Sequence, residues 1–230
     1  MSAAEIAPGV RHLRTGEGPG SNVYLLEDGD GVVAFDAATK GTGEQILAAA
    51  GGRLTKLILS HSHVDHRGGA PELGVPVHCH PDEVADCEGD AGQHYIDFDR
   101  IQNEAMRPVM TNLNASWDGG PVKIAGTVED GDEVAGFRVV HVPGHAPGQI
   151  VLFRESDRLL LAADAFYVFD LEAVQLTPPR VPHPSVNWDT DLARRSLERL
   201  AELEPASAWP GHGDAVRGDV AELLRQAAKA

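Results

Sequence analysis

The residues best suited to chemistry lie in one short segment, HSHVDH at positions 61–66. Three imidazoles and a carboxylate within six positions are ligands typical of borderline divalent ions, zinc above all. A packing role does not explain them, because an imidazole buried without a partner costs roughly 1–3 kcal/mol. The segment therefore predicts a metal site.

A catalytic metal site fits this segment better than a structural one. Structural zinc sites are usually closed and rich in thiolates, and neither cysteine of the chain, Cys79 or Cys87, belongs to the segment. Two divalent ions about 3.5–4 Å apart can share a hydroxide and lower the pKa of water to about 7. The expected chemistry is hydrolysis, with a metal-bound hydroxide attacking a carbonyl.

The composition limits the partners of the chain. It has 230 residues, of which 42% are hydrophobic, and a formal net charge of −16. Nucleic acids and anionic membrane surfaces reward positive charge, so neither is expected as a partner. The chain begins without a secretory signal and contains no long apolar run, which predicts a cytoplasmic protein.

Strands and helices are expected around the segment. The apolar run at 54–60 predicts a buried strand that leads directly into HSHVDH, and 21–27 with 31–36 predicts a hairpin. A capping box at 42–45 predicts the start of a helix, and apolar stripes predict two helices near the C-terminus. Hairpins and helices in both halves indicate an α/β protein with mixed sheets covered by helices.

The segment resembles the HxHxDH motif of the metallo-β-lactamase fold superfamily. Three further parts of that pattern follow in order: GH at 144–145, Asp164 at the end of an apolar strand, and GHG at 211–213. The resemblance covers nearly the whole chain, and it is specific for the fold but not for the substrate. It implies a single domain over residues 1–230, built as a four-layer αβ/βα sandwich of two mixed sheets flanked by helices.

The resemblance also implies a set of seven ligands for two metal ions. One ion is expected at His61, His63 and His145, a second at Asp65, His66 and His212, and Asp164 is expected to bridge them. Zinc is expected, with iron or manganese as alternatives. Asp36, which matches an early short motif, is expected to brace the ligand loop rather than bind metal.

Catalytic and substrate-binding roles are expected for a few more residues. Asp65 could also carry a proton after the attack. Tyr167 stands three positions after Asp164, as in acyl-homoserine-lactone lactonases of this superfamily, and could donate to an oxyanion or leaving oxygen; a simple aromatic rim residue is the alternative. Phe98, Trp117, Phe166 and Tyr167 are expected to contact the substrate.

Residues 89–118, called the 89–118 segment below, are irregular in pattern but rich in large apolar side chains. These side chains are Tyr95, Phe98, Ile101, Met106, Met110 and Trp117. We expect the segment to form a cap over the metals that selects the substrate. A helical insertion packed elsewhere is the alternative.

The expected function is hydrolysis of a small acyl compound, namely an ester, lactone or thioester, by a monomer or homodimer. Two other enzyme classes stay open: an iron-dependent oxidoreductase of the same fold, resembling persulfide dioxygenases, and a phosphodiesterase. A third possibility is a metal-binding or partner-binding protein without catalysis.

Overall fold

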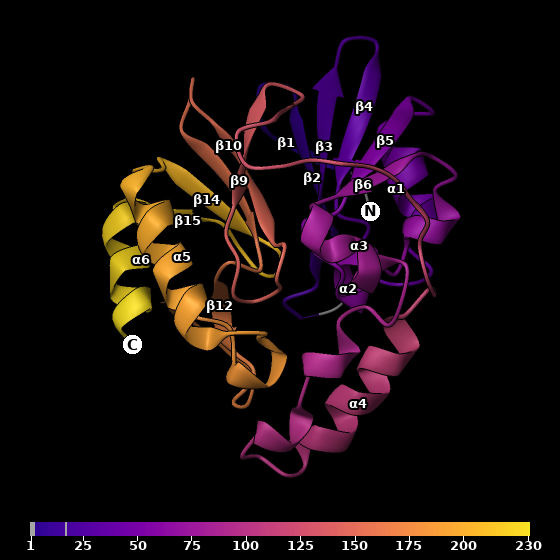
Figure 1. Ribbon diagram of the computed structural model, residues 1–230. Helices are drawn as coiled ribbons and strands as arrows, with labels where there is room; N and C mark the ends of the chain where they lie inside the picture. The colour runs from indigo at the N-terminus through magenta and orange to yellow at the C-terminus, as the bar shows by residue number, and fades with distance from the viewer. Residues whose placement is uncertain (1–2, 17) are drawn as a thin grey trace.

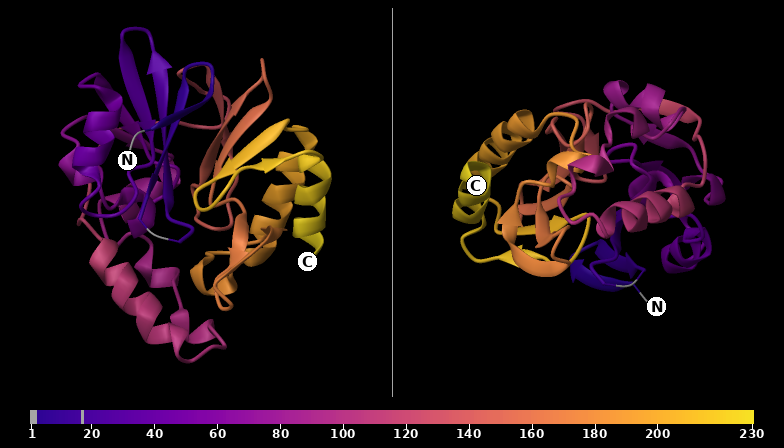
Figure 2. Two further views of the ribbon diagram at one scale, coloured as in Figure 1. Left: turned by 180° about the vertical axis from the view of Figure 1, so that it is seen from behind. Right: turned by 90° about the horizontal axis from the view of Figure 1, so that it is seen from below.

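Two large sheets pack face to face in the computed structural model, which describes residues 3–16 and 18–230 (Figure 1). Helices cover the outer face of each sheet, and the two sheets with their helices form the four layers that the sequence predicts (Figure 2). The α/β class and the sandwich architecture are therefore confirmed.

The first sheet contains seven strands in sequence order. Strands β1 to β4 are antiparallel, and β4 to β7 are parallel. They are β1 (Ala4–Ala7), β2 (Val10–Thr15), β3 (Ser21–Asp28), β4 (Gly31–Phe35), β5 (Leu54–Ile58), β6 (Val77–Cys79) and β7 (Ile124–Thr127). The hairpin that the sequence predicts is the pair β3 and β4.

The second sheet contains six strands in the order β15-β14-β11-β10-β9-β8. They are β8 (Glu133–Val134), β9 (Phe137–His141), β10 (Ile150–Arg154), β11 (Leu159–Ala163), β14 (Ser207–Pro210) and β15 (Val216–Arg217). A separate hairpin consists of β12 (Tyr167–Asp170) and β13 (Gln175–Arg180).

Alternation along the strands divides the apolar side chains between the inner and outer faces of the sheets. In β3, Tyr24 and Leu26 face the second sheet, whereas Val23 and Leu25 belong to the cluster under the outer helices. Successive residues of a strand point to opposite faces, so a continuous apolar strand serves two layers at once. The described chain has three apolar clusters. One lies between the two sheets, and the other two lie between each sheet and the helices that cover it.

Six α-helices complete the described chain. They are α1 (Gly43–Ala50), α2 (Val64–Arg67), α3 (Val84–Cys87), α4 (Met106–Trp117), α5 (Thr190–Glu202) and α6 (Val220–Lys229). Side chains of α1 and α3 pack on the first sheet, and those of α5 and α6 pack on the second. Helix α4 and the β12–β13 hairpin instead project from one edge of the sandwich (Figure 1).

Two local expectations need correction. The helix after residue 42 forms, but the hydroxyl of Thr42 donates to the carbonyls of Ala37 and Thr39 instead of capping it. The 89–118 segment, which showed no clear pattern, contains the 12-residue helix α4. None of the helices in the described ranges is long and apolar enough to cross a membrane.

Candidate metal centre

The ends of four strands bring the predicted ligands to one edge of the sandwich. HSHVDH follows β5, His145 follows β9, Asp164 follows β11 directly, and His212 follows β14. Strands β9 and β11 both run antiparallel to β10, and β14 runs parallel to β11, so these three strands end at the same edge. The fold thus gathers groups that lie as far as 151 residues apart, from position 61 to position 212.

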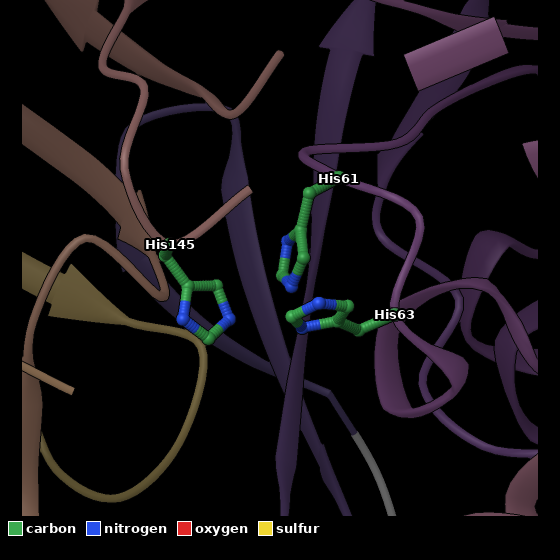
Figure 3. Close-up of side chains that lie close together, drawn as sticks. All are labelled: His61, His63 and His145. Carbon is green, nitrogen blue, oxygen red and sulfur yellow. The ribbon is translucent and has the colours of Figure 1, made fainter. Parts of the chain in front are cut away.

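The seven predicted ligands lie together at this edge. His61 and His63 approach from the first sheet and His145 from the second, with their rings pointing toward one another (Figure 3). The possible ligand atoms lie within 4.8 Å of one another in each of three overlapping groups. These groups are His61, His63 and His145; His61, His66 and Asp164; and Asp65, His66 and His212.

Each imidazole has one nitrogen engaged by the surrounding protein. His61 Nδ1 lies 2.9 Å from the Ser60 hydroxyl, and His66 donates from Nδ1 to Asp36 Oδ2 at 2.7 Å. His145 donates from Nδ1 to Asn187, and His212 donates to the carbonyl of Gly20. These bonds fix the ring orientation and leave the opposite nitrogen free to bind a cation.

His63 is oriented in the opposite sense. Its Nε2 lies 3.1 Å from the hydroxyl of Tyr95, so Nδ1 is the nitrogen left for the centre. Tyr95 belongs to the 89–118 segment and was expected only as part of an apolar wall. The sequence pattern gave no signal for its contact with His63.

Buried polar atoms without partners show that the site fits metal ions. Within the described chain, no hydrogen bond reaches Nε2 of His61, His66 or His145, or Oδ1 of Asp164. His66 Nε2 lies 3.2 Å from Asp164 Oδ1, without the angle of a hydrogen bond. Four orphaned atoms gathered in one buried region are costly unless a ligand joins them, and their types suit zinc.

The electrostatics also favour positive charge at this point. Burial opposes a charged imidazole at His212, but Asp164 and Asp65 outweigh burial and raise its pKa to about 10. Burial together with neighbouring imidazoles holds the pKa values of His61 and His63 well below the usual range. The carboxylates therefore attract a cation, and these two imidazoles are neutral, as metal ligands must be.

Asp36 and Gly211 give the site its close packing. Asp36 accepts from the backbone and hydroxyl of Ser60 as well as from His66, so it braces the loop as expected. At Gly211, a Cβ atom would lie 2.1 Å from Asp164 Oδ1 and 2.7 Å from His66 Cε1. Only glycine allows the backbone to pass so close to these two side chains.

A cavity of about 420 Å³ opens directly on the centre. His63, Asp65 and His212 line it together with Tyr167, and Phe98 and Trp117 of the 89–118 segment line it from the other side. Ring centroids of Tyr167 and His212 lie 5.8 Å apart. Phe98, Trp117 and Tyr167 thus lie where a substrate contact was expected.

The prediction that Phe166 contacts the substrate is wrong. It is fully buried in the apolar cluster beneath α5 and α6 and does not line the cavity. Alternation along the chain explains this, because Tyr167 and Phe169 point to the cavity while Phe166 and Val168 point to the core. Ile101 is likewise buried and does not line the cavity.

Glu83 also reaches the centre indirectly. Its carboxylate is buried and accepts hydrogen bonds from the backbone N–H groups of Ser62 and Gly148, at 2.8 and 2.7 Å. Ser62 lies between two predicted ligands, and Gly148 lies three residues after His145. A single side chain therefore ties together the loops from the two sheets, a role that its sequence context did not suggest.

Comparisons with known proteins agree with this geometry. A model described as the metallo-beta-lactamase superfamily matches residues 16–212. The chain is 28% identical to the probable metallo-hydrolase YflN of Bacillus subtilis, over 90% of this chain and 87% of the relative. It is 30% identical to an N-acyl homoserine lactonase of a Bacillus species, over 65% of this chain and 51% of that relative. A metallo-beta-lactamase family protein of Thermus thermophilus, TTHA1429, superposes with a TM-score of 0.71 at 25% identity, over 98% of this chain and 78% of the other.

Proposed function

Because the chain belongs to the metallo-beta-lactamase superfamily, we propose that it hydrolyses an ester, lactone or thioester with the help of two divalent metal ions, zinc in the first place. The chain is a metal-dependent hydrolase by family. We propose, beyond this, which bond it cleaves and how many ions of which metal it binds.

The observation that carries the proposal is the pair of ligand groups on either side of Asp164. One group is His61, His63 and His145, and the other is Asp65, His66 and His212. Asp164 Oδ2 lies 3.5 Å from His145 Nε2 and 3.4 Å from His212 Nε2, so its carboxylate adjoins both groups. We assign each group to one ion and Asp164 to both.

The chemistry of the centre follows from its ligands. When bound, the ions supply Lewis acidity that activates water near neutral pH and polarises an acyl carbonyl. The four atoms of the candidate centre that lack hydrogen bonds belong to three imidazoles and a carboxylate, so no thiolate is needed.

Two side chains of the protein support the reaction in this proposal. Asp65 lines the cavity, and its Oδ2 lies 3.2 Å from His212 Nε2, so the carboxylate lies at the candidate centre, within reach of a proton released there. Burial raises the pKa of Tyr167 far above its usual value, so the phenol stays protonated and can donate to a developing oxyanion. Asp65 is assigned the proton transfer and Tyr167 the oxyanion contact.

Two further points support an acyl substrate. The relative named as an N-acyl homoserine lactonase hydrolyses an acyl compound by its name. The 89–118 segment lines the cavity with Phe98, Met106, Met110 and Trp117, which suits a cap over an organic substrate.

The test is a turnover screen of zinc-loaded protein with lactones, aryl esters, thioesters, phosphodiesters and a persulfide. We expect turnover of at least one acyl class, loss of that turnover after chelation, and its return with zinc. His61→Ala and Asp164→Ala should each lower turnover more than about a hundredfold, whereas His94→Ala, an exposed histidine outside the cavity, should not. Turnover of the phosphodiester or persulfide alone would reject the proposal.

A further inference from the structure

Helix α4 has an apolar stripe that covers no protein core. Met106, Met110, Leu113 and Trp117 follow one another at spacings of four, three and four residues, so they share one face of the helix. None of the four belongs to any of the three apolar clusters of the described chain, and all four line the cavity above the metal centre. The stripe therefore faces a space that ligand atoms can fill.

The opposite wall of the cavity is apolar as well. Tyr167, Phe169, Leu171 and Val174 of the β12–β13 hairpin and its turn line it. Both walls project from the same edge of the sandwich, as the view from behind shows (Figure 2). At the candidate metal centre the lining is polar, with His63, Asp65 and His212. A bound substrate would thus contact the candidate metal-binding side chains at one end and apolar side chains along the rest of its length.

The charges around the cavity also limit which substrates can bind. No lysine or arginine is among the described residues that line it. Of its two acidic residues, Asp65 is assigned to a metal ion and Asp170 is paired with Arg180, so the lining offers no free cation to an anionic group. The formal net charge of the whole chain is −16. A substrate that carries a carboxylate or phosphate away from the scissile bond would be repelled and would find no cation to pair with.

We propose that the substrate is an uncharged ester or lactone whose acyl or alkyl part is an apolar chain lying between α4 and the β12–β13 hairpin. This inference rests on the proposed function and narrows it. Thioesters of carrier thiols that bear phosphate or carboxylate groups are excluded, and so are substrates recognised by an anionic group. Leu113 and Val174, exposed by 36% and 64%, extend the apolar lining to the cavity mouth.

The first test is chain length. With zinc-loaded protein and p-nitrophenyl esters from ethanoate to octanoate, kcat/KM should rise with each CH₂ by up to about fourfold, which corresponds to ~0.8 kcal/mol. An ester of equal length with a terminal carboxylate should react at least about tenfold more slowly. A flat series, or faster reaction of the charged ester, would overturn the inference.

A pair of variants on α4 tests the location. Met110→Lys places a cation in the stripe, and Val109→Lys places one at a neighbouring position that is 43% exposed and does not line the cavity. Met110→Lys should lower kcat/KM for the octanoate at least about tenfold and reduce the penalty of the terminal carboxylate. Val109→Lys should change neither. Equal effects of the two variants would contradict the assignment.

A binding measurement separates this inference from the proposed function. We expect calorimetry to show that 2-nonanone binds the zinc-loaded protein and that 8-oxononanoate, which adds a distal carboxylate, binds at least about tenfold more weakly. Binding of the ketone without ester turnover would reject the proposed function and keep the apolar site. Ester turnover without chain-length preference and without ketone binding would reject the apolar site and keep the hydrolase.

Discussion

The imidazoles of the centre depend on partners that sequence spacing does not reveal. The five histidines of the candidate centre each use one ring nitrogen for a contact inside the protein, and four of the five partner residues come from distant parts of the chain. Such partners are usually worth about 10–100-fold in metal affinity. The contact between His63 and Tyr95 is distinctive because Tyr95 belongs to the 89–118 segment.

Replacing Tyr95 should weaken metal binding. Tyr95→Phe removes the hydroxyl that holds His63 and should lower zinc affinity about 10–100-fold. Tyr167→Phe should leave zinc affinity unchanged and lower kcat by about a hundredfold, since its role is with the oxyanion. Chelator competition and steady-state kinetics measure both. Unchanged zinc affinity in Tyr95→Phe would show that the contact is dispensable.

Individual residues differed in how far the sequence predicted them. The seven candidate ligands, which the structure brings together, could be predicted because HSHVDH is dense and the others follow strands in a familiar order. The role of Asp36 could be predicted from the same resemblance. Those of Asn187, Tyr95 and Glu83 could not, because a single polar residue far along the chain carries no periodicity and no spacing. The predicted substrate contact of Phe166 was wrong because Phe166 and Tyr167 are adjacent aromatic residues, and the sequence did not show which of them faces the cavity.

At the scale of elements, Arg67 joins the centre to both ends of the 89–118 segment. It follows His66, is fully buried, and donates through Nη1 to the carbonyls of Asp86, Cys87 and Gly89. Its Nη2 donates to Asp118 at 2.9 Å. The short helix α2 therefore holds both candidate metal ligands, Asp65 and His66, and the base of the 89–118 segment.

Removing the guanidinium should loosen this base. Arg67→Met leaves three carbonyls without a donor and should lower the free energy of unfolding by about 3–5 kcal/mol. Amide hydrogen exchange should accelerate in residues 89–118 more than in the sheets. Arg100→Met, whose side chain is 58% exposed, is the control and should have little effect. A loss below about 1 kcal/mol with unchanged exchange would contradict this role.

Elements with strong apolar patterns could be predicted, and those shaped by tertiary contacts could not. The buried strands and the amphipathic helices α5 and α6 followed from period and length. Helix α4 was missed because it has no capping side chain, contains Pro108 near its start and buries no residue fully. The apolar residues of α4 line the cavity and are not packed in a core. The helix therefore lacks the strong contrast between a buried and an exposed face that usually identifies a helix in a sequence.

At the scale of the whole molecule, Glu83 connects the two halves. Its two backbone hydrogen bonds reach the loops that follow β5 and β9, one from each sheet. Burial raises the pKa of Glu83 to about 7 from an ordinary value of 4.5, although N–H groups of Gly148 and Ser62 oppose this. The protonated form is thus the more stable one in the folded protein below neutral pH.

Stability should therefore depend on pH through this group. A raised pKa means that the stabilisation is complete below pH 4.5 and is lost as the pH rises through about 7. The difference in unfolding free energy between wild type and Glu83→Gln should shift by about 3 kcal/mol in favour of the variant across this range. Urea unfolding at several pH values measures it, with exposed Glu44→Gln as control. A difference independent of pH would contradict the shift.

We propose that two metal ions lie between the sheets at the edge where the strands end. Anomalous X-ray scattering from crystals of the zinc-loaded protein tests it most directly. We expect two zinc peaks, one among His61, His63 and His145 and the other among Asp65, His66 and His212, with Asp164 between them. A crystal with zinc bound only elsewhere, or with His145 and His212 turned away from every zinc peak, would contradict it.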